Sequence, residues 1–184
     1  MTMNQRQTAA GCLWLGLAFL VARAAETGEP AAADRVGFPA GYAEKFQVLR
    51  AANKPKVHNL GTIYANERAA SVTETGQLPY PEGSVIVMDW AEPLKADDGT
   101  VITGPDGLWQ KGKVVRVDVM RRERGYGEAY GDKRAGEWEF ASYLPDGTRV
   151  ETAGKPASCA QCHQKATAAR DFVFQGRFPP LQGN

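Results

Sequence analysis

The stretch SVIVMDW at residues 84–90 decides the fold, because its side chains alternate between two faces and it holds three β-branched residues in a row. A period of two is the pattern of a strand, and β-branched side chains pack well on a pleated surface. One face carries Val85, Val87 and Asp89, and the other carries Ile86, Met88 and Trp90. The stretch therefore predicts a β-strand, and we expect the face with Met88 to be the buried one.

Similar stretches on both sides of this strand predict the rest of a sheet. Residues 57–64 and 114–120 alternate in the same way, and residues 137–140 alternate acidic and aromatic side chains, as a half-exposed strand does. The turn Pro145-Asp146-Gly147 leads back towards residues 148–150. Strands that follow one another through turns pair in antiparallel fashion. We therefore expect four or five antiparallel strands.

Helices are predicted outside these strands. Tyr42, Phe46 and Leu49 recur at helical spacing and predict an amphipathic helix over residues 41–50. Asn66 is a suitable N-cap for a helix at residues 67–75, with Gly76 as the C′ residue that ends it. The pattern predicts the α+β class, mainly an antiparallel β-sheet with flanking helices.

A C-terminal motif, Cys159-Ala160-Gln161-Cys162-His163, carries the chemistry. Two cysteines two residues apart, with histidine directly after the second, form the attachment pattern of a c-type haem. Each thiol can form a thioether with one vinyl group of the porphyrin, while the adjacent histidine ligates the iron. The motif predicts one covalently attached haem c, held by Cys159 and Cys162, with His163 as the metal ligand.

Three other readings of the motif compete with haem attachment. A redox Cys-x-x-Cys pair opens a helix after a strand in a βαβ unit, whereas this motif follows a loop that contains glycine and proline. A structural zinc site needs four ligands, and after residue 24 only His58 is a further soft ligand. A disulfide between Cys159 and Cys162 would leave His163 without a role. Haem attachment explains most of the stretch.

The N-terminal region predicts export. Residues 1–24 combine a short polar start, an apolar run and a small-x-small ending, which is the pattern of a secretory signal peptide. A retained membrane anchor is the alternative, although the apolar run is short for a span. Residues 25–35 predict a flexible linker and residues 36–184 the haem domain. Bacteria attach haem c beyond the cytoplasmic membrane, so we expect a periplasmic protein.

Charge singles out no partner for this chain. Without its first 24 residues it has 20 basic and 21 acidic side chains. A nearly neutral surface without clusters of lysine and arginine argues against nucleic acid or an anionic membrane as a target. The remaining length suits one domain with one core.

A mostly β chain with its haem motif at the far end resembles the cytochrome P-460 family, which includes the cytochromes c′-beta. The common small c-type cytochromes are instead nearly all-helical, with the motif near the N-terminus. The matching features are Phe38-Pro39, GTIY at 61–64, GSVIV at 83–87, EWEF at 137–140, CAQCH at 159–163 and DFVF at 171–174. The resemblance implies a homodimer of antiparallel sheets, a five-coordinate haem with a vacant distal face, and a periplasmic location.

The resemblance also implies two kinds of distal site. Hydroxylamine-oxidising members have a lysine bonded to the porphyrin edge, whereas the cytochromes c′-beta lack this link and bind nitric oxide or carbon monoxide in an apolar pocket. Met88 falls at the position of the linking lysine, and Lys95, Lys111 and Lys113 are nearby candidates for a displaced link. We therefore place ligand binding and electron transfer with a redox partner protein ahead of hydroxylamine or nitric-oxide oxidoreductase activity.

Met88 has two interpretations. It is either a core methionine that fills space, or a thioether that approaches the iron. A His163/Met88 pair would make a six-coordinate electron carrier without substrate chemistry, and Met120 is a weaker candidate for the same role. His58, the only other histidine, is expected on the first strand as a structural residue, with a distal acid–base or ligand role as the alternative.

Other residues receive structural interpretations. The run Arg121-Arg122-Glu123-Arg124 is expected to be a solvated strand end, with orientation of a nitrogenous substrate as the alternative. The large aromatic residues are expected to pack in the core or against the haem; they are Trp90, Trp109, Trp138 and Phe140.

Overall fold

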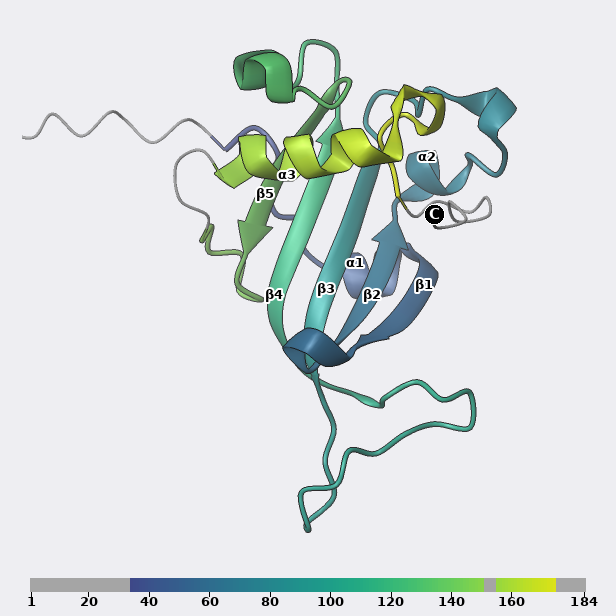
Figure 1. Cartoon of the computed structure of the whole chain (residues 1–184), viewed down its shortest axis with the longest axis vertical. Coiled ribbons are helices and arrows are strands. Elements are labelled where there is room, and N and C mark those ends of the chain that lie inside the picture. Colours follow the sequence, from purple (N-terminus) through teal and green to yellow (C-terminus); the bar gives the residue numbers. More distant parts are fainter. Residues whose placement is uncertain (1–33, 151–154, 175–184) are drawn as a thin grey trace, which may run out of the picture. The chain divides into compact units, whose positions relative to one another are not determined.

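A computed structural model describes residues 34–150 and 155–174. The predicted signal peptide and nearly all of the predicted linker lie outside these residues. Within them, five strands form one antiparallel sheet in the order β1-β2-β3-β4-β5 (Figure 1). The strands are β1 (Gln47–Lys54), β2 (Asn59–Ala65), β3 (Val85–Pro93), β4 (Lys111–Arg122) and β5 (Trp138–Tyr143). The predicted α+β class and antiparallel sheet are confirmed.

Short helices surround this sheet. The α-helices are α1 (Tyr42–Lys45), α2 (Glu67–Ala70) and α3 (Lys155–His163). The 3₁₀ segments are η1 (Pro55–Val57), η2 (Thr75–Gln77), η3 (Glu128–Lys133), η4 (Gln164–Ala166) and η5 (Ala168–Arg170). Among the described residues, none of the helices has the length and apolar character needed to cross a bilayer.

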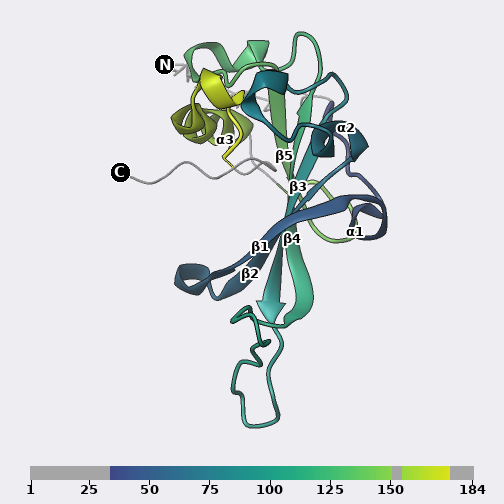
Figure 2. The same ribbon diagram turned by 90° about the vertical axis from the view of Figure 1, so that its right-hand side faces the viewer.

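The sheet separates two cores, because α1 and α3 lie on opposite faces of it (Figure 2). We call these faces the α1 face and the α3 face. The core of the α1 face includes Val36, Tyr42, Tyr64, Val85, Val87, Val117, Val119, Ala141 and Tyr143. The core of the α3 face includes Ile63, Ile86, Met120, Trp138, Phe140, Ala160 and Val173. Because side chains alternate along β2, β3, β4 and β5, each of these four strands contributes residues to both cores.

The burial of β3 differs from the prediction. The Val85/Val87/Asp89 face, which we did not expect to be the buried one, is fully covered, whereas Met88 and Trp90 on the other face are only half-buried. Val36, Phe38 and Tyr42 pack on the α1 face. There the Tyr42 and Tyr64 rings meet edge to face, with their centroids 5.2 Å apart. The α3 face keeps a cavity, and Met88 and Trp90 line it.

The helix predicted over residues 41–50 is wrong beyond its first turn. Phe46 takes an extended conformation and ends α1, and the chain continues as β1, paired antiparallel with β2. Tyr42 and Phe46 pack in the core of the α1 face, whereas Leu49 packs in that of the α3 face. Their spacing therefore reflects two faces of a sheet and not one face of a helix.

The second helix begins where predicted and ends early. The Asn66 side chain accepts a hydrogen bond from the Ala69 amide at 3.0 Å, which confirms it as the N-cap of α2. Asn66 also bonds the backbone at Gly83 and Val85 and so ties α2 to the start of β3. The helix ends at Ala70, and Gly76 lies in η2, so its prediction as the C′ residue is wrong.

The last strand is more buried than its alternating acids suggest. Glu139 is buried on the α1 face, where Arg35 pairs with it at 3.0 Å, so the half-exposed strand was a wrong prediction. The turn at residues 145–147 is confirmed, because the Leu144 amide donates to the Thr148 carbonyl at 2.8 Å. The chain then pairs back on β5 through the bridge between Tyr143 and Arg149.

Candidate functional site

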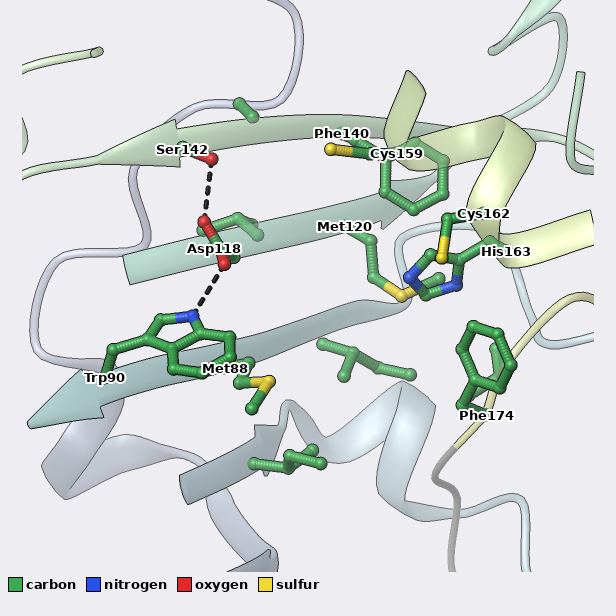
Figure 3. Close-up of a pocket in the computed structure, with 15 residues that line it drawn as sticks. Met88, Trp90, Asp118, Met120, Phe140, Ser142, Cys159, Cys162, His163 and Phe174 are labelled. Carbon is green, nitrogen blue, oxygen red and sulfur yellow. Dashed lines mark hydrogen bonds between the residues drawn. The ribbon is translucent and has the colours of Figure 1, made fainter. Parts of the chain in front are cut away.

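Helix α3 presents the haem motif to the α3 face of the sheet. Cys162 and His163 follow Cys159 by three and four residues along the helix, so each lies on the same side of α3 as Cys159. All three line the same cavity, and Figure 3 shows them together at one end of it. Cys159 and Cys162 are not joined in a disulfide. The two thiols and the imidazole of the motif thus face the same cavity.

His163 is held in the form that can ligate a metal. Its Nδ1 lies 2.8 Å from the Phe172 carbonyl oxygen, which can only accept, so Nδ1 carries the proton and Nε2 keeps its lone pair. Burial lowers the pKa of His163, against the opposing effect of this hydrogen bond, and the imidazole is therefore neutral at pH 7. Phe140 and Phe174 flank the ring at centroid distances of 4.8 and 5.1 Å.

The turn that supplies the Phe172 carbonyl is strained and tightly anchored. Asp171 and Phe172 both have positive φ angles, of 47° and 60°, which side chains other than glycine seldom adopt. The Trp138 indole donates to the Asp171 carbonyl at 2.9 Å, and the Tyr80 amide donates to the Asp171 carboxylate at 3.0 Å. These contacts hold the turn in place, and through it the orientation of His163.

Arg122 adds a charged support to the same turn. It is only 8% exposed, and its guanidinium faces Asp171 at 3.3 Å and Glu137 at 2.8 Å. The prediction of a solvated strand end is therefore wrong for this residue. Arg124, by contrast, is exposed and pairs with Glu82 at 3.2 Å. Arg122 does not line the cavity. It acts on the site indirectly, by supporting the turn at Asp171.

The cavity itself is apolar and has a volume of about 280 Å³. The sheet contributes most of its wall, and α3 and the segment after it close one end. Its lining residues are Ile63, Ile86, Met88, Trp90, Asp118, Val119, Met120, Phe140, Ala141, Ser142, Cys159, Cys162, His163, Val173 and Phe174. Paired thiols, a neutral imidazole and apolar walls are the donor set and surroundings that suit a covalently attached haem. The residues present therefore fit that group.

A polar cluster lies on the cavity wall away from α3 (Figure 3). The Asp118 carboxylate accepts from the Trp90 indole at 2.6 Å and from the Ser142 hydroxyl at 2.7 Å. Arg116 faces the same carboxylate at 3.0 Å and stacks 4.7 Å from the centre of the Trp90 ring. Sequence reasoning missed Asp118 and Ser142. The signal was Asp118 at an inward position of β4, between Val117 and Val119.

Several residues singled out from the sequence meet at this cavity. Met88, Met120, Trp90 and Phe140 all line it, and Figure 3 shows Met88 beside Trp90 and Met120 beside His163. Trp138 packs in the core of the α3 face behind it. Met88 and His163 thus line the same cavity.

Other predicted residues lie elsewhere. His58 is exposed at the end of η1, where its φ of 52° closes the turn between β1 and β2, so its expected place on the first strand is wrong. Trp109 belongs to the β3–β4 connection, and its amide donates to Asn53 at 2.9 Å. Neither lines the cavity.

The lysines suggested for a displaced porphyrin link also lie outside the cavity lining. Lys111 points to the α1 face, where its ammonium group pairs with Asp89 and donates to the Tyr64 hydroxyl at 2.7 Å. Lys95 and Lys113 are exposed, and of the described residues that line the cavity none is a lysine. The described residues also contain no group of three or more His, Cys, Asp and Glu side chains placed to hold a metal ion.

Comparison with known proteins gives one finding on family. The family model described as Cytochrome P460 matches residues 39–175, which span the sheet, α3 and the turn at Phe172. A search of curated proteins finds no match.

Proposed function

The chain belongs to the Cytochrome P460 family, and we propose that it is an exported mono-haem c-type cytochrome whose distal site binds a small ligand such as nitric oxide or carbon monoxide and which takes part in electron transfer. Membership of a cytochrome family makes it a haem-binding protein. The finer statement rests on one observation above all: Cys159, Cys162 and His163 share one side of α3 and face an apolar cavity.

Each part of the site has a task in this proposal. The two thiols would hold the porphyrin by thioethers, and Nε2 of His163 would ligate the iron. When bound, the haem supplies an iron centre for ligand coordination and one-electron transfer. Phe140 and Phe174 restrict the imidazole ring, and the apolar lining excludes water and favours small uncharged ligands.

A six-coordinate electron carrier with Met88 or Met120 as second ligand is the alternative, since both thioethers line the cavity. Two observations favour the open site. The tip of Met88 lies against β2 at Gly61, and Figure 3 shows Met88 beside Trp90, apart from His163. Met120 lies beside His163 itself, on the side of the cavity where α3 enters (Figure 3).

Oxidoreductase activity towards hydroxylamine or nitric oxide is a second candidate function. Asp118 favours it, because a fixed carboxylate on the cavity wall can accept a proton from a bound nitrogenous substrate. Met88 at the place of the linking lysine argues against it. Steady-state oxidation of hydroxylamine by the holoprotein, compared with an Asp118→Asn variant, separates this candidate from simple ligand binding.

The visible spectrum of the ferrous holoprotein, with and without carbon monoxide, tests the main proposal. An open site responds to carbon monoxide at once, whereas two protein ligands give sharp six-coordinate bands and little response. A strongly red-shifted ferrous Soret band would contradict the absence of a lysine link. Intact mass of the protein from the periplasmic fraction tests thioether attachment and signal cleavage together. A mass without haem would overturn the proposal.

Oligomeric state and partner are part of the same proposal. The family resemblance supports a homodimer, and electron transfer requires a redox partner protein. Sedimentation of the holoprotein over a range of concentrations tests the first, and reduction by candidate periplasmic donors tests the second.

A further inference from the structure

Gly61 occupies a position on β2 whose backbone does not require glycine. It pairs with Ala52 on β1 and with Trp90 on β3, and its φ lies outside the left-handed region that favours glycine. Glycine in the interior of a strand weakens the strand, and it often marks a close approach of another group. The reason for glycine here must therefore lie in what covers it.

Two side chains from neighbouring strands cover Gly61. A Cβ atom at this position would lie 2.5 Å from the terminal methyl carbon of Met88 and 3.3 Å from Cε of Lys54. Real Cβ atoms do not approach other carbons as closely as 2.5 Å, so the Met88 methyl group occupies the space that a side chain at residue 61 would need. The bare α-carbon is a seat for the tip of Met88.

The strand register gives the direction in which Met88 leans. Met88 stands opposite Ile63 on β2, whereas Gly61 stands opposite Trp90, two residues further along β3. The tip of Met88 therefore lies towards the Trp90 end of the cavity, and Figure 3 shows it on that side, apart from His163. In this position the end of the Met88 side chain lies against β2 at Gly61.

We propose that Gly61 is a positioning residue that seats Met88 against the sheet and so keeps the ligand side of the cavity open. This inference rests on the proposed function, since it assumes a haem with an accessible distal face. A side chain at residue 61 would displace the Met88 methyl group. The sheet lies beneath it, with Trp90 on one flank and Lys54 on the other, so the displaced thioether has to move into the cavity.

The test is a double-mutant cycle on the holoprotein with carbon monoxide as the probe. We expect Gly61→Ala to weaken carbon monoxide binding about tenfold, because one added methyl group overpacks the cavity floor. The Met88→Ala protein is the reference for the second half of the cycle, and in that background Gly61→Ala should cause no loss of affinity. Gly76→Ala is the matched control, because nothing lies within 4 Å of a Cβ at that position. The ferrous spectrum shows whether the displaced thioether also adds six-coordinate bands.

Each outcome has a separate meaning. Wild-type affinity in Gly61→Ala overturns the inference and leaves the open site intact. A loss that persists in the double variant also overturns it, because the effect then comes from the β2 backbone. A wild-type protein that ignores carbon monoxide overturns the proposed open site and this inference together.

A measurement on the wild-type protein covers the case in which Gly61→Ala does not fold. In the diamagnetic ferrous carbon monoxide complex, with ¹³C-methyl methionine, we expect a nuclear Overhauser contact between the Met88 methyl group and the Gly61 α-protons. Absence of this contact in the assigned spectrum overturns the inference without any variant.

Discussion

The two faces of the sheet place a carboxylate on neighbouring strands and use it in opposite ways. Asp89 on the α1 face is 0% exposed, and it is enclosed by Lys111 and by the Tyr42 hydroxyl, which donates to it at 3.1 Å. Asp118 on the α3 face is about one-third exposed and opens onto the cavity. On the α1 face, protein groups enclose Asp89. On the α3 face, Asp118 faces the cavity. We therefore expect the α1 face to contribute mainly to stability and the α3 face to the proposed ligand binding.

On the α1 face, the pKa values of Lys111 and Tyr42 are shifted from their usual range. Burial alone would lower the pKa of Lys111, but its hydrogen bonds to Asp89 and Tyr64 outweigh this effect and raise it. Burial, with Asp89 beside it, raises the pKa of Tyr42. Lys111 therefore stays charged and Tyr42 stays neutral across the physiological range.

The largest effect is expected from removing the two thiols on the α3 face. Replacing both thiols, Cys159→Ala/Cys162→Ala, removes every thioether, so we expect a complete loss of covalently bound haem. Intact mass spectrometry under denaturing conditions measures it. The α1 face does not take part, so the Asp89→Ala protein serves as a control and keeps its haem mass. Covalent haem on the double variant would contradict the assignment of the motif.

The next effect breaks the α1 face. Asp89→Ala removes one partner of a buried ion pair, and we expect a loss of about 3 kcal/mol in the free energy of unfolding. Lys111 is 31% exposed and can turn partly to water, which keeps the loss at the lower end for such pairs. Urea denaturation of the holoprotein measures it. Carbon monoxide affinity should stay at the wild-type value, and a parallel loss of affinity would show that the two faces are coupled.

A smaller effect is expected from the matched acid on the cavity wall. Asp118→Ala removes the carboxylate that accepts from the Trp90 indole and the Ser142 hydroxyl, but this carboxylate is about one-third exposed, so we expect a loss of about 1 kcal/mol in the free energy of unfolding. The same urea experiment provides the comparison with Asp89→Ala. Equal losses from the two variants would refute the division between a closed and an open face.

The smallest effect concerns how the stability of the protein depends on pH through Asp171, which lies in the turn that bonds His163. Burial raises the pKa of Asp171 in the folded protein, so the folded state binds this proton more tightly than the unfolded state does. The contribution of Asp171 to stability is therefore greatest below its unfolded pKa of about 3.9 and is lost as pH rises through its folded pKa. Asp171→Asn should lack this loss.

Urea midpoints of wild type and Asp171→Asn between about pH 4 and neutrality test this sign. The variant should gain stability relative to wild type as the pH rises. A relative loss over the same range would mean that the pairing of Asp171 with Arg122 outweighs its burial.

Local sequence patterns predicted much of the fold but did not predict how side chains pack between strands. The alternation of residues 84–90 and the N-cap at Asn66 act within one segment, and both predictions hold. The helix predicted at residues 41–50 failed because Phe46 and Leu49 serve opposite faces of a sheet. A single segment does not reveal which face each of its side chains will meet.

The same difference between local and long-range features applies to the site. The motif at residues 159–163 is local in sequence, and its thiols and imidazole line one cavity. The Phe172 carbonyl, the Asp118 cluster and the seat at Gly61 each depend on register between elements distant in sequence. Asp118 could be noticed as an acid among valines, but its partners Trp90 and Ser142 could not.

The hydrogen bond from His163 to the Phe172 carbonyl has a consequence for assembly. It is made by the polypeptide alone, through a turn fixed by Trp138 and Tyr80, so the imidazole is preorganised before any haem arrives. The entropy of orienting the ring is lost during folding and not during cofactor capture. In the proposed haem site, cofactor binding would therefore begin from an imidazole that is already oriented.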